Sequence, residues 1–142
     1  MTGASIASMN PDGTVIAITV TLDGDLADVG QTLINHYQLD AKRHQLFELG
    51  DLLRVGEHIG DQSSSDPQAR LKNWCTAYGR DGGQPQWPAR HYADVISWLD
   101  EVEREYNYLW DGSEWLMCKP HLVGLDNYEF RSVVQCLMEN ES

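Results

Sequence analysis

A short aromatic segment in the second half of the chain constrains the fold more than any other feature. Residues 105–117, EYNYLWDGSEWLM, place aromatic and sulfur-bearing side chains on both sides of Asp111-Gly112. An Asp-Gly pair between alternating apolar residues is a strong hairpin signal, because a type I′ turn needs positive φ at both central positions. The sequence therefore predicts antiparallel strands over 105–110 and 113–118.

A two-residue turn also fixes which side chains share a face. Tyr108 is then expected opposite Trp115, and Tyr106 opposite Met117, so that all four lie on one face. Cross-strand aromatic pairs stabilise a sheet by roughly 0.2–1 kcal/mol each. We expect this face to be core packing, and the alternative is that Tyr106, Tyr108 and Trp115 line a ligand pocket.

Periodicity predicts two further strands and three helices before the hairpin. Residues 14–22 are β-branched or apolar between glycines, and 73–79 alternate, which is typical of strands. Apolar residues recur at helical spacing over 26–37, 40–49 and 91–104. Within the first of these helices, Gly30 is expected to allow close packing on the sheet.

The two ends of the chain are predicted to differ. Residues 1–13 are interpreted as a flexible leader that ends in a Pro-Asp-Gly turn. Residues 120–142 are interpreted as a C-terminal extension ending in a helix over 126–139. That helix either closes the core or meets a second copy. The fold class is therefore α+β: one domain over 14–142, with a mainly antiparallel sheet of about four strands and helices on one face.

The charge of the chain bears on its partners. The net charge is −12, and acidic residues crowd the C-terminal third. Such a surface repels nucleic-acid phosphates and anionic lipids, so we expect no direct nucleic-acid binding and no membrane association, and a basic protein partner is favoured. A DNA mimic is a lesser alternative. No apolar run approaches the roughly 20 residues of a membrane helix, and no signal peptide is recognisable, which favours the cytoplasm.

The residues that most often carry chemistry are scattered. Cys75, Cys118 and Cys136 form no CxxC pair, which predicts buried, reduced thiols. The five histidines form none of the close pairs typical of metal sites. The aspartates over 23–28 lack the twelve-residue loop of a calcium site, and turn and capping roles explain them. We therefore expect no catalytic residue, no cofactor and no metal.

Four segments together resemble a family of small proteins encoded by phages and other mobile elements. In order, they are LDGDLADVGQTLINHY (22–37), LFELGDLLRVGEHI (46–59), AYGRDGG (77–83) and EYNYLWDGSEW (105–115). The chain departs from that family before the first Asp-Gly, where relatives often carry an aromatic residue and a histidine. The resemblance implies a mobile-element accessory protein, such as an integron-cassette product, and transfers no catalytic residue.

The sequence thus favours a non-enzymatic, acidic accessory protein that binds a host protein or a second copy of itself through the C-terminal helix. Trp87, between two prolines, is a candidate contact anchor unless it packs back over the sheet. The alternative is a small-ligand-binding protein or enzyme with the aromatic pocket named above. The full set of candidate interaction residues is Trp87, Tyr106, Tyr108, Trp115, Phe130, Val134 and Leu137.

Overall fold

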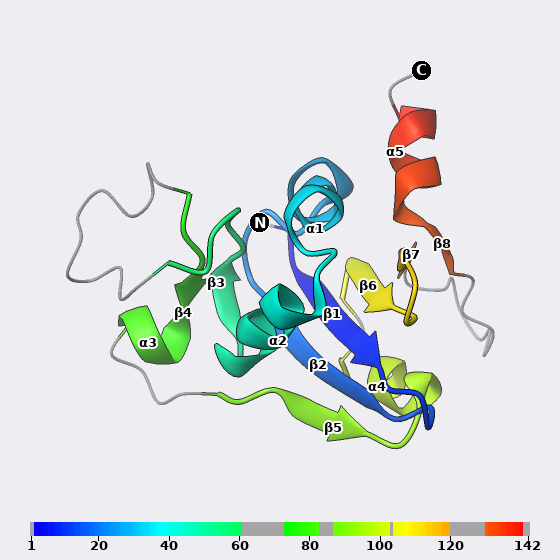
Figure 1. Ribbon diagram of the computed structural model, residues 1–142, viewed down its shortest axis with the longest axis horizontal. Coiled ribbons are helices and arrows are strands. Elements are labelled where there is room, and N and C mark those ends of the chain that lie inside the picture. Colours follow the sequence, from blue (N-terminus) through cyan, green and yellow to red (C-terminus); the bar gives the residue numbers. More distant parts are fainter. Residues whose placement is uncertain (1, 61–72, 83–86, 103, 120–129, 141–142) are drawn as a thin grey trace.

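The computed structural model describes residues 2–60, 73–82, 87–102, 104–119 and 130–140 (Figure 1). Its elements, in chain order, are β1 (Ala4–Met9), β2 (Val15–Val20), a short π-helical segment η1 (Leu26–Gly30), α1 (Gln31–His36), α2 (Asp40–Glu48), β3 (Leu52–Arg54), β4 (Thr76–Ala77), α3 (Tyr78–Gly82), β5 (Arg90–Tyr92), α4 (Val95–Val102), β6 (Tyr106–Trp110), β7 (Trp115–Cys118), β8 (Arg131–Ser132) and α5 (Val133–Asn140).

The fold class is α+β, as predicted, but the sheet is larger than expected. It has eight strands in the order β4-β3-β2-β1-β6-β7-β8, with β5 paired to β2 off this path. Most pairs are antiparallel, whereas β1–β6 and β2–β3 are parallel, so the sheet is mixed. The prediction of about four strands is wrong because several strands have only two or three residues, too few to show a period.

The first strand corrects the prediction of a flexible leader over residues 1–13. Residues 4–9, ASIASM, form β1, which lies between β2 and β6 near the middle of the sheet. Ala4 to Ala7 are all buried, and the Ser5 hydroxyl donates to Asn107 Oδ1 at 2.6 Å. Small side chains let both faces of β1 be covered closely, and their low hydrophobicity hides the strand in the sequence.

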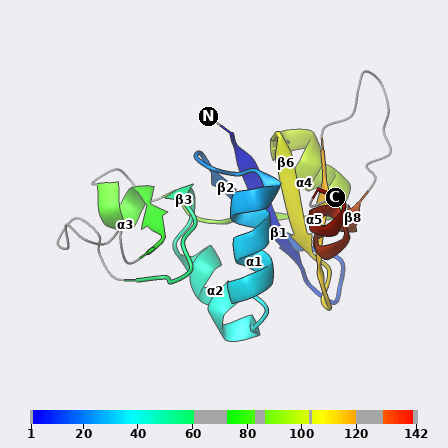
Figure 2. The same cartoon turned by 90° about the horizontal axis from the view of Figure 1, so that it is seen from above.

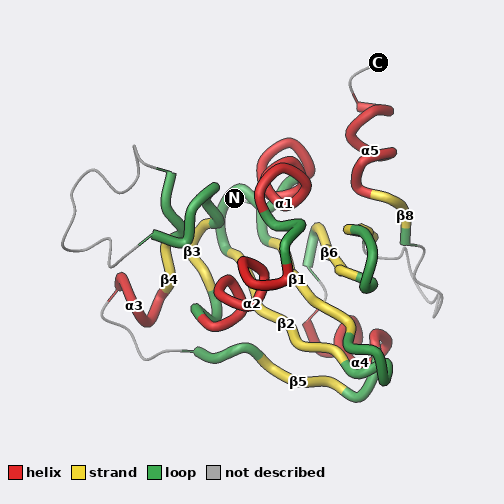
Figure 3. Tube along the Cα trace, in the orientation of Figure 1, coloured by secondary structure: helices red, strands yellow, loops and turns green. Residues whose placement is uncertain are grey.

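Strand β2 confirms the predicted strand over 14–22 and is where the sheet divides (Figure 3). One edge of β2 pairs with β1, while the other pairs with β3 at Val20 and with β5 over residues 15–17. Asp51 fills the fork: its Oδ1 accepts the Thr19 N–H at 3.0 Å, and both carboxylate oxygens accept Arg90 donors. A side chain thus replaces the missing strand partner.

Helices cover both faces of the sheet, which corrects the prediction of helices on one face. In Figure 2, α1 and α2 lie on one side of β1 and α4 lies on the other. The larger core cluster packs under η1, α1, α2 and α5, and a second cluster of Ala7, Val15, Trp98, Leu99 and Val102, among others, packs under α4. Helix α4 therefore buries the small and apolar residues that β1 and β2 present on this second face.

The predicted helix over 26–37 is present but divided. Asp25 has the extended backbone of an N-cap residue without a side-chain capping bond, and the π-helical η1 precedes α1. A Cβ atom on Gly30 would lie 2.9 Å from Leu26 Cδ1 and 3.5 Å from Tyr108 Cε1. The close approach is to the end of the Leu26 side chain in the same helical segment, and the distance to Tyr108 on the sheet is an ordinary van der Waals contact, so the expectation that Gly30 allows close packing on the sheet stays a prediction.

The remaining predicted elements are shorter than expected. The helix over 40–49 is confirmed as α2. Of the strand over 73–79, only β4 forms before the chain turns into α3. The helix over 91–104 begins at Val95 because β5 takes the preceding residues, and Asp94 Oδ1 accepts the Ser97 N–H at 2.8 Å.

The hairpin is present, but its register differs from the prediction by two residues. Trp110 faces Trp115 and Tyr108 faces Met117 across a four-residue loop over 111–114. The Asp111 carboxylate accepts the N–H groups of Ser113 and Glu114, and this makes the longer loop favourable. Because side chains alternate with a period of two, a slip of two residues leaves every side chain on its predicted face.

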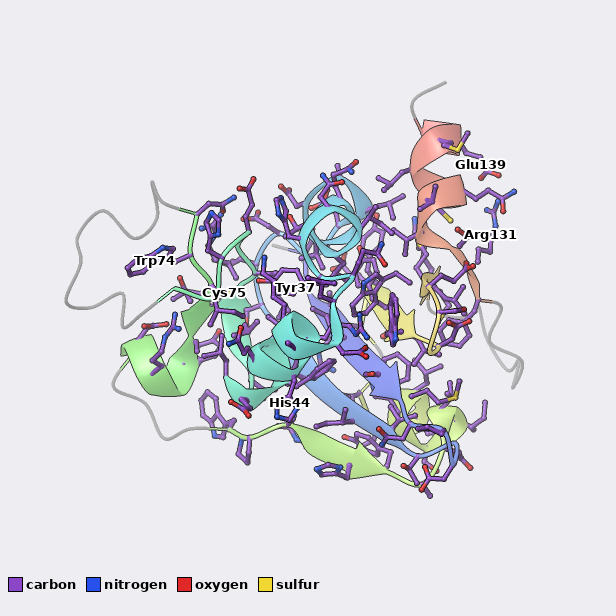
Figure 4. The ribbon with its side chains drawn as sticks, in the orientation of Figure 1. Tyr37, His44, Trp74, Cys75, Arg131 and Glu139 are labelled. Atoms are coloured by element: carbon purple, nitrogen blue, oxygen red, sulfur yellow. The ribbon has the colours of Figure 1, made fainter. Side chains whose placement is uncertain are left out.

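The chain ends in β8 and α5, whereas the first part of the predicted 126–139 helix lies outside the described residues. Val133 and Cys136 are buried against the main core cluster, so α5 helps to close the domain's own core. Arg131 and Glu139 lie side by side along this segment (Figure 4), with Nη2 and Oε1 2.5 Å apart. Val134 and Met138 face outward.

Candidate functional site

The aromatic face of the hairpin is interior, as expected, and this removes two residues from the candidate surface. Tyr108 and Trp115 have no exposed area. The Tyr108 hydroxyl donates to Gly24 O at 2.8 Å, and Trp115 Nε1 donates to Tyr37 O at 3.1 Å. Burial raises the pKa of Tyr108 far above its usual value. Neither side chain can line a ligand pocket or contact a partner in this fold.

The other candidate interaction residues do not form one surface. Trp87 is 43% exposed, with its ring edge-on to Tyr78 at 5.3 Å between centroids. Tyr106 is half-buried and stacks on Tyr108. At the other end of the sheet, Phe130 stacks on buried Trp98, Val134 is exposed, and Leu137 is half-buried against the core. The structure does not bring these side chains together.

The cysteines are free and buried, as predicted. Figure 4 shows Cys75 beside Tyr37 in the interior, where the two side-chain heteroatoms lie 3.3 Å apart and the Tyr37 hydroxyl donates to Gly56 O. Burial raises the pKa of Cys75, so the thiol is a poor nucleophile. Among the described residues, no three histidine, cysteine or carboxylate side chains are arranged to hold a metal ion.

One groove lies at the carboxyl ends of the parallel strands β1 and β6. The groove consists of two adjoining cavities that share Arg43. The larger cavity has a volume of about 590 Å³, and its lining includes Arg43 and Trp110. The Arg43 guanidinium already donates to Tyr37 O, Gln38 O and the Asp40 carboxylate, and it stacks 3.7 Å from the Trp110 ring centroid. Its donors bind the turn between α1 and α2 and its stacking on Trp110 joins α2 to the hairpin, so this arginine offers a ligand little unused hydrogen-bonding capacity.

A second, more polar cavity of about 250 Å³ lies between α1 and the segment that follows β3. We call it the α1–β3 cleft. Its lining consists of three carboxylates, an arginine, a histidine, three amides and three smaller side chains: Asp23, Asp28, Glu57, Arg54, His36, Gln31, Asn35, Asn73, Ala27, Thr32 and Val55. Ligand pockets are usually lined mostly by apolar side chains with a few convergent polar groups, whereas this cavity is lined mostly by polar ones and therefore suits only a polar or charged ligand.

The backbone around this cleft is unusual. Asp23 and Asn73 have φ values of 56° and 58°, and among the described residues they are the only ones other than glycine with positive φ. Both line the cleft although they are far apart in the chain. The β3–β4 register also shifts between Leu52 and Arg54. Left-handed residues and strand irregularities gather at functional sites, where they aim side chains.

The charged groups of the cleft are incompletely paired. Partial burial raises the pKa of Asp28, and the neighbouring Asp25 and Asp23 raise it further, while Arg54 acts in the opposite direction. Glu57 lies 3.7 Å from His36 Nε2. Arg54 Nη2 donates to Asn73 Oδ1 at 3.1 Å, but its Nη1 is buried without a hydrogen-bond partner among the described residues. The cleft thus carries excess negative charge and an unused donor.

The cleft is not predictable from the sequence, although part of its lining is conspicuous there. The aspartates over 23–28 drew attention as a candidate calcium loop and were assigned to turns and caps. Arg54, Glu57 and Asn73 carry no motif, and only the pairing of β2 with β3 brings them towards α1. The one available signal was the cluster of acidic residues around Gly24.

Comparison with known proteins adds no further constraint. No protein-family model matches the chain, and neither a curated protein nor a solved structure matches it. The resemblance to mobile-element proteins therefore stays a prediction. No helix among the described residues has the length and apolar character needed to cross a membrane.

Proposed function

We propose that this chain is a binding protein for a small ligand with a positively charged nitrogen, held in the α1–β3 cleft. The observation that carries the proposal is the convergence of Asp23, Asp28 and Glu57 on one cavity that contains a single arginine. Burial, and after it the neighbouring Asp25 and Asp23, raise the pKa of Asp28, and a bound cation favours its ionised form.

The lining also suits an ammonium or guanidinium group in its hydrogen bonding. Such a group donates several hydrogen bonds and accepts none. The carboxylates supply acceptors on both walls of the cleft, whereas the side-chain oxygens of Asn35 and Asn73 already accept hydrogen bonds from Gln31 and Arg54. The net charge of −12 additionally draws cations towards the protein, which speeds their encounter with the site.

The test is an NMR titration of the protein with a panel of small amines at 0.15 M salt, where long-range attraction is screened. We expect saturable shifts confined to the cleft. Asp28→Asn should weaken binding at least tenfold, because hydrogen bonds to charged groups contribute about 1.5–3 kcal/mol. Asp100→Asn, on the exposed side of α4, is the matched control and should bind as the wild type does.

Two results would contradict the proposal. Equal weakening in both variants would mean that amines are attracted only by overall charge. Shifts spread over the acidic surface without saturation would lead to the same conclusion.

Self-association through α5 is a second candidate function, favoured by one observation. Val134 and Met138 lie four residues apart on this helix and are 47% and 66% exposed. Apolar side chains at this spacing share one helix face. If they form a dimer contact, light scattering should give twice the chain mass, and Met138→Glu should return the protein to a monomer. A monomeric wild type at high concentration would exclude this candidate.

A further inference from the structure

We infer that α5 pairs with α5 of a second copy of this chain in an antiparallel contact with two-fold symmetry, made by two apolar side chains and a ring of four charges. This inference rests on the self-association proposed above as the second candidate function, and it extends that function to a defined orientation. It is argued from the exposed face of α5, from the ion pair on that face and from the charge of the chain.

The exposed face of α5 has apolar residues at its centre. Val133 and Cys136 are buried against the main core cluster, so the opposite side of the helix points outward. Val134 and Met138 lie on that outward side and are 47% and 66% exposed. In Figure 1, α5 lies at the periphery of the molecule beside β8, where a second molecule can reach it.

The charges of this face are arranged as a second copy requires. Arg131 precedes the two apolar residues, Glu139 follows them, and both side chains are about half exposed. A two-fold axis through the face brings Arg131 of each copy to the partner's Glu139, and Val134 to the partner's Met138. A chain that carries its own complement in reversed order is suited to pair with itself.

The ion pair within each copy does not have to break for this contact to form. Arg131 Nη2 lies 2.5 Å from Glu139 Oε1 of the same chain. A guanidinium has five N–H donors and a carboxylate has two acceptor oxygens, so each group can keep its own partner and gain the partner copy's. The two ion pairs then lie antiparallel and form a ring of alternating charges.

The charge of the chain favours a second copy over other occupants. The net charge is −12, so two copies repel each other over most of their surfaces. Residues 130–140 hold one arginine and one glutamate as their only charged side chains, so their charges cancel and this face opposes a like-charged molecule least. The same face offers a basic protein no excess of carboxylates.

The size of the face predicts a reversible dimer. Stable interfaces bury roughly 1,200–2,000 Å² in total, which two apolar side chains from each copy do not approach. Dimers should therefore appear as the protein concentration rises. Charge complementarity in such a contact determines orientation more than affinity, so the orientation is the part to test.

The experiment reverses one charge at a time and then mixes the variants. Association of the full chain is measured by sedimentation equilibrium over a concentration series at about 0.15 M salt. Arg131→Glu leaves two negative charges on the face and Glu139→Arg leaves two positive ones, so each variant alone should associate at least about tenfold more weakly than the wild type. An equal mixture should regain association, because each negative face then meets a positive one.

A matched control separates this result from an effect of overall charge. Glu139→Arg changes the net charge by two, from −12 to −10, and weaker repulsion between copies would then strengthen association. Asp100→Arg makes the same change on the exposed side of α4 and should not weaken association. Thermal unfolding of each variant shows whether it is folded.

The outcomes separate this inference from the self-association on which it rests. If either charge reversal alone leaves association unchanged, or if the mixture does not regain it, the antiparallel orientation is wrong while a dimer through α5 stands. If the wild type is monomeric over the whole series, the self-association fails and the inference fails with it.

Discussion

The aromatic face of the β6–β7 hairpin and the α1–β3 cleft differ in how completely their polar groups are hydrogen-bonded. On the hairpin face, the Tyr108 hydroxyl and the Trp115 indole N–H each meet a main-chain carbonyl. In the cleft, Arg54 has a donor that meets no acceptor in the described part of the chain, and burial and neighbouring carboxylates raise the pKa of Asp28. Satisfied groups stabilise a fold, and groups left unsatisfied are where a ligand gains affinity.

The residues that are most conspicuous in the sequence are not the ones that the structure leaves available for binding. The tyrosines and tryptophans of the hairpin are the most eye-catching residues of the chain, and the structure uses them as core. The charged residues of the cleft look ordinary in sequence. Substitutions on each side should therefore have effects of different size and, in one case, of different sign.

The largest effect is expected for Trp115→Ala on the hairpin face. Removing a fully buried tryptophan creates a cavity and should lower the free energy of unfolding by about 3–5 kcal/mol, measured by urea denaturation. Trp87→Ala, at a 43% exposed site, is the control and should cost about 1 kcal/mol through its contact with Tyr78. Similar costs at both sites would show that the hairpin face is not tightly packed.

A smaller effect is expected at the fork in the sheet. Asp51→Ala leaves the Thr19 N–H without its acceptor and should lower the free energy of unfolding by about 1–3 kcal/mol. Arg90→Ala removes only the partly exposed partner of Asp51 and should cost about 0.2–1 kcal/mol. If Arg90→Ala costs as much as Asp51→Ala, the ion pair rather than the main-chain hydrogen bond holds the fork together.

Tyr108→Phe tests a single hydrogen bond on the sealed face. The variant keeps the ring and removes the hydroxyl that donates to Gly24 O. We expect a loss of about 0.5–1.5 kcal/mol in chemical denaturation, because the carbonyl loses its partner. An unchanged stability would mean that water replaces the hydroxyl, which would contradict the sealed nature of this face.

The smallest effect, and one of opposite sign, is expected for Asp28→Asn. The folded chain raises the pKa of Asp28, so the ionised carboxylate is less favourable when folded than when unfolded. The variant should therefore be slightly more stable than the wild type at pH 7. This gain should shrink as the pH falls through the raised folded pKa towards about 3.9, the unfolded value, and vanish below it.

Asp94→Asn is the control for the direction of this stability change. The Ser97 N–H and hydroxyl lower the pKa of Asp94, so its ionised form stabilises the fold at neutral pH. The substitution should be destabilising above about pH 4 and neutral once Asp94 is protonated in both states. Urea midpoints measured between pH 3 and pH 7 check both variants, and the same sign for both would contradict the electrostatic account of the cleft.

The parts of the fold that were predictable are those in which a local pattern and a tertiary role agree. The strand over 14–22, the helix over 40–49 and the buried hairpin face all have a clear period, and all are present. The two-residue turn was wrong because the Asp111 carboxylate caps a longer loop, yet the faces were right because the error equalled one full period.

The unpredictable parts depend on contacts between distant segments. Strand β1 consists mainly of alanine and serine, and only its pairing with β2 and β6 makes it a strand. Strands β3 and β5 have three residues each, which is too short for a period. The α1–β3 cleft needs Arg54 to meet Asp28 across the parallel β2–β3 pair. Local sequence contains no signal for contacts between such distant segments.

The place of β1 has a consequence for how the chain assembles. Its parallel neighbour β6 lies about a hundred residues further along, as the Ser5–Asn107 bond records with a separation of 102. Strand β1 must therefore wait for the synthesis of about a hundred further residues before its second edge is covered. Until then one edge of a central strand stays unpaired, so the sheet cannot be completed before the β6–β7 hairpin has been made.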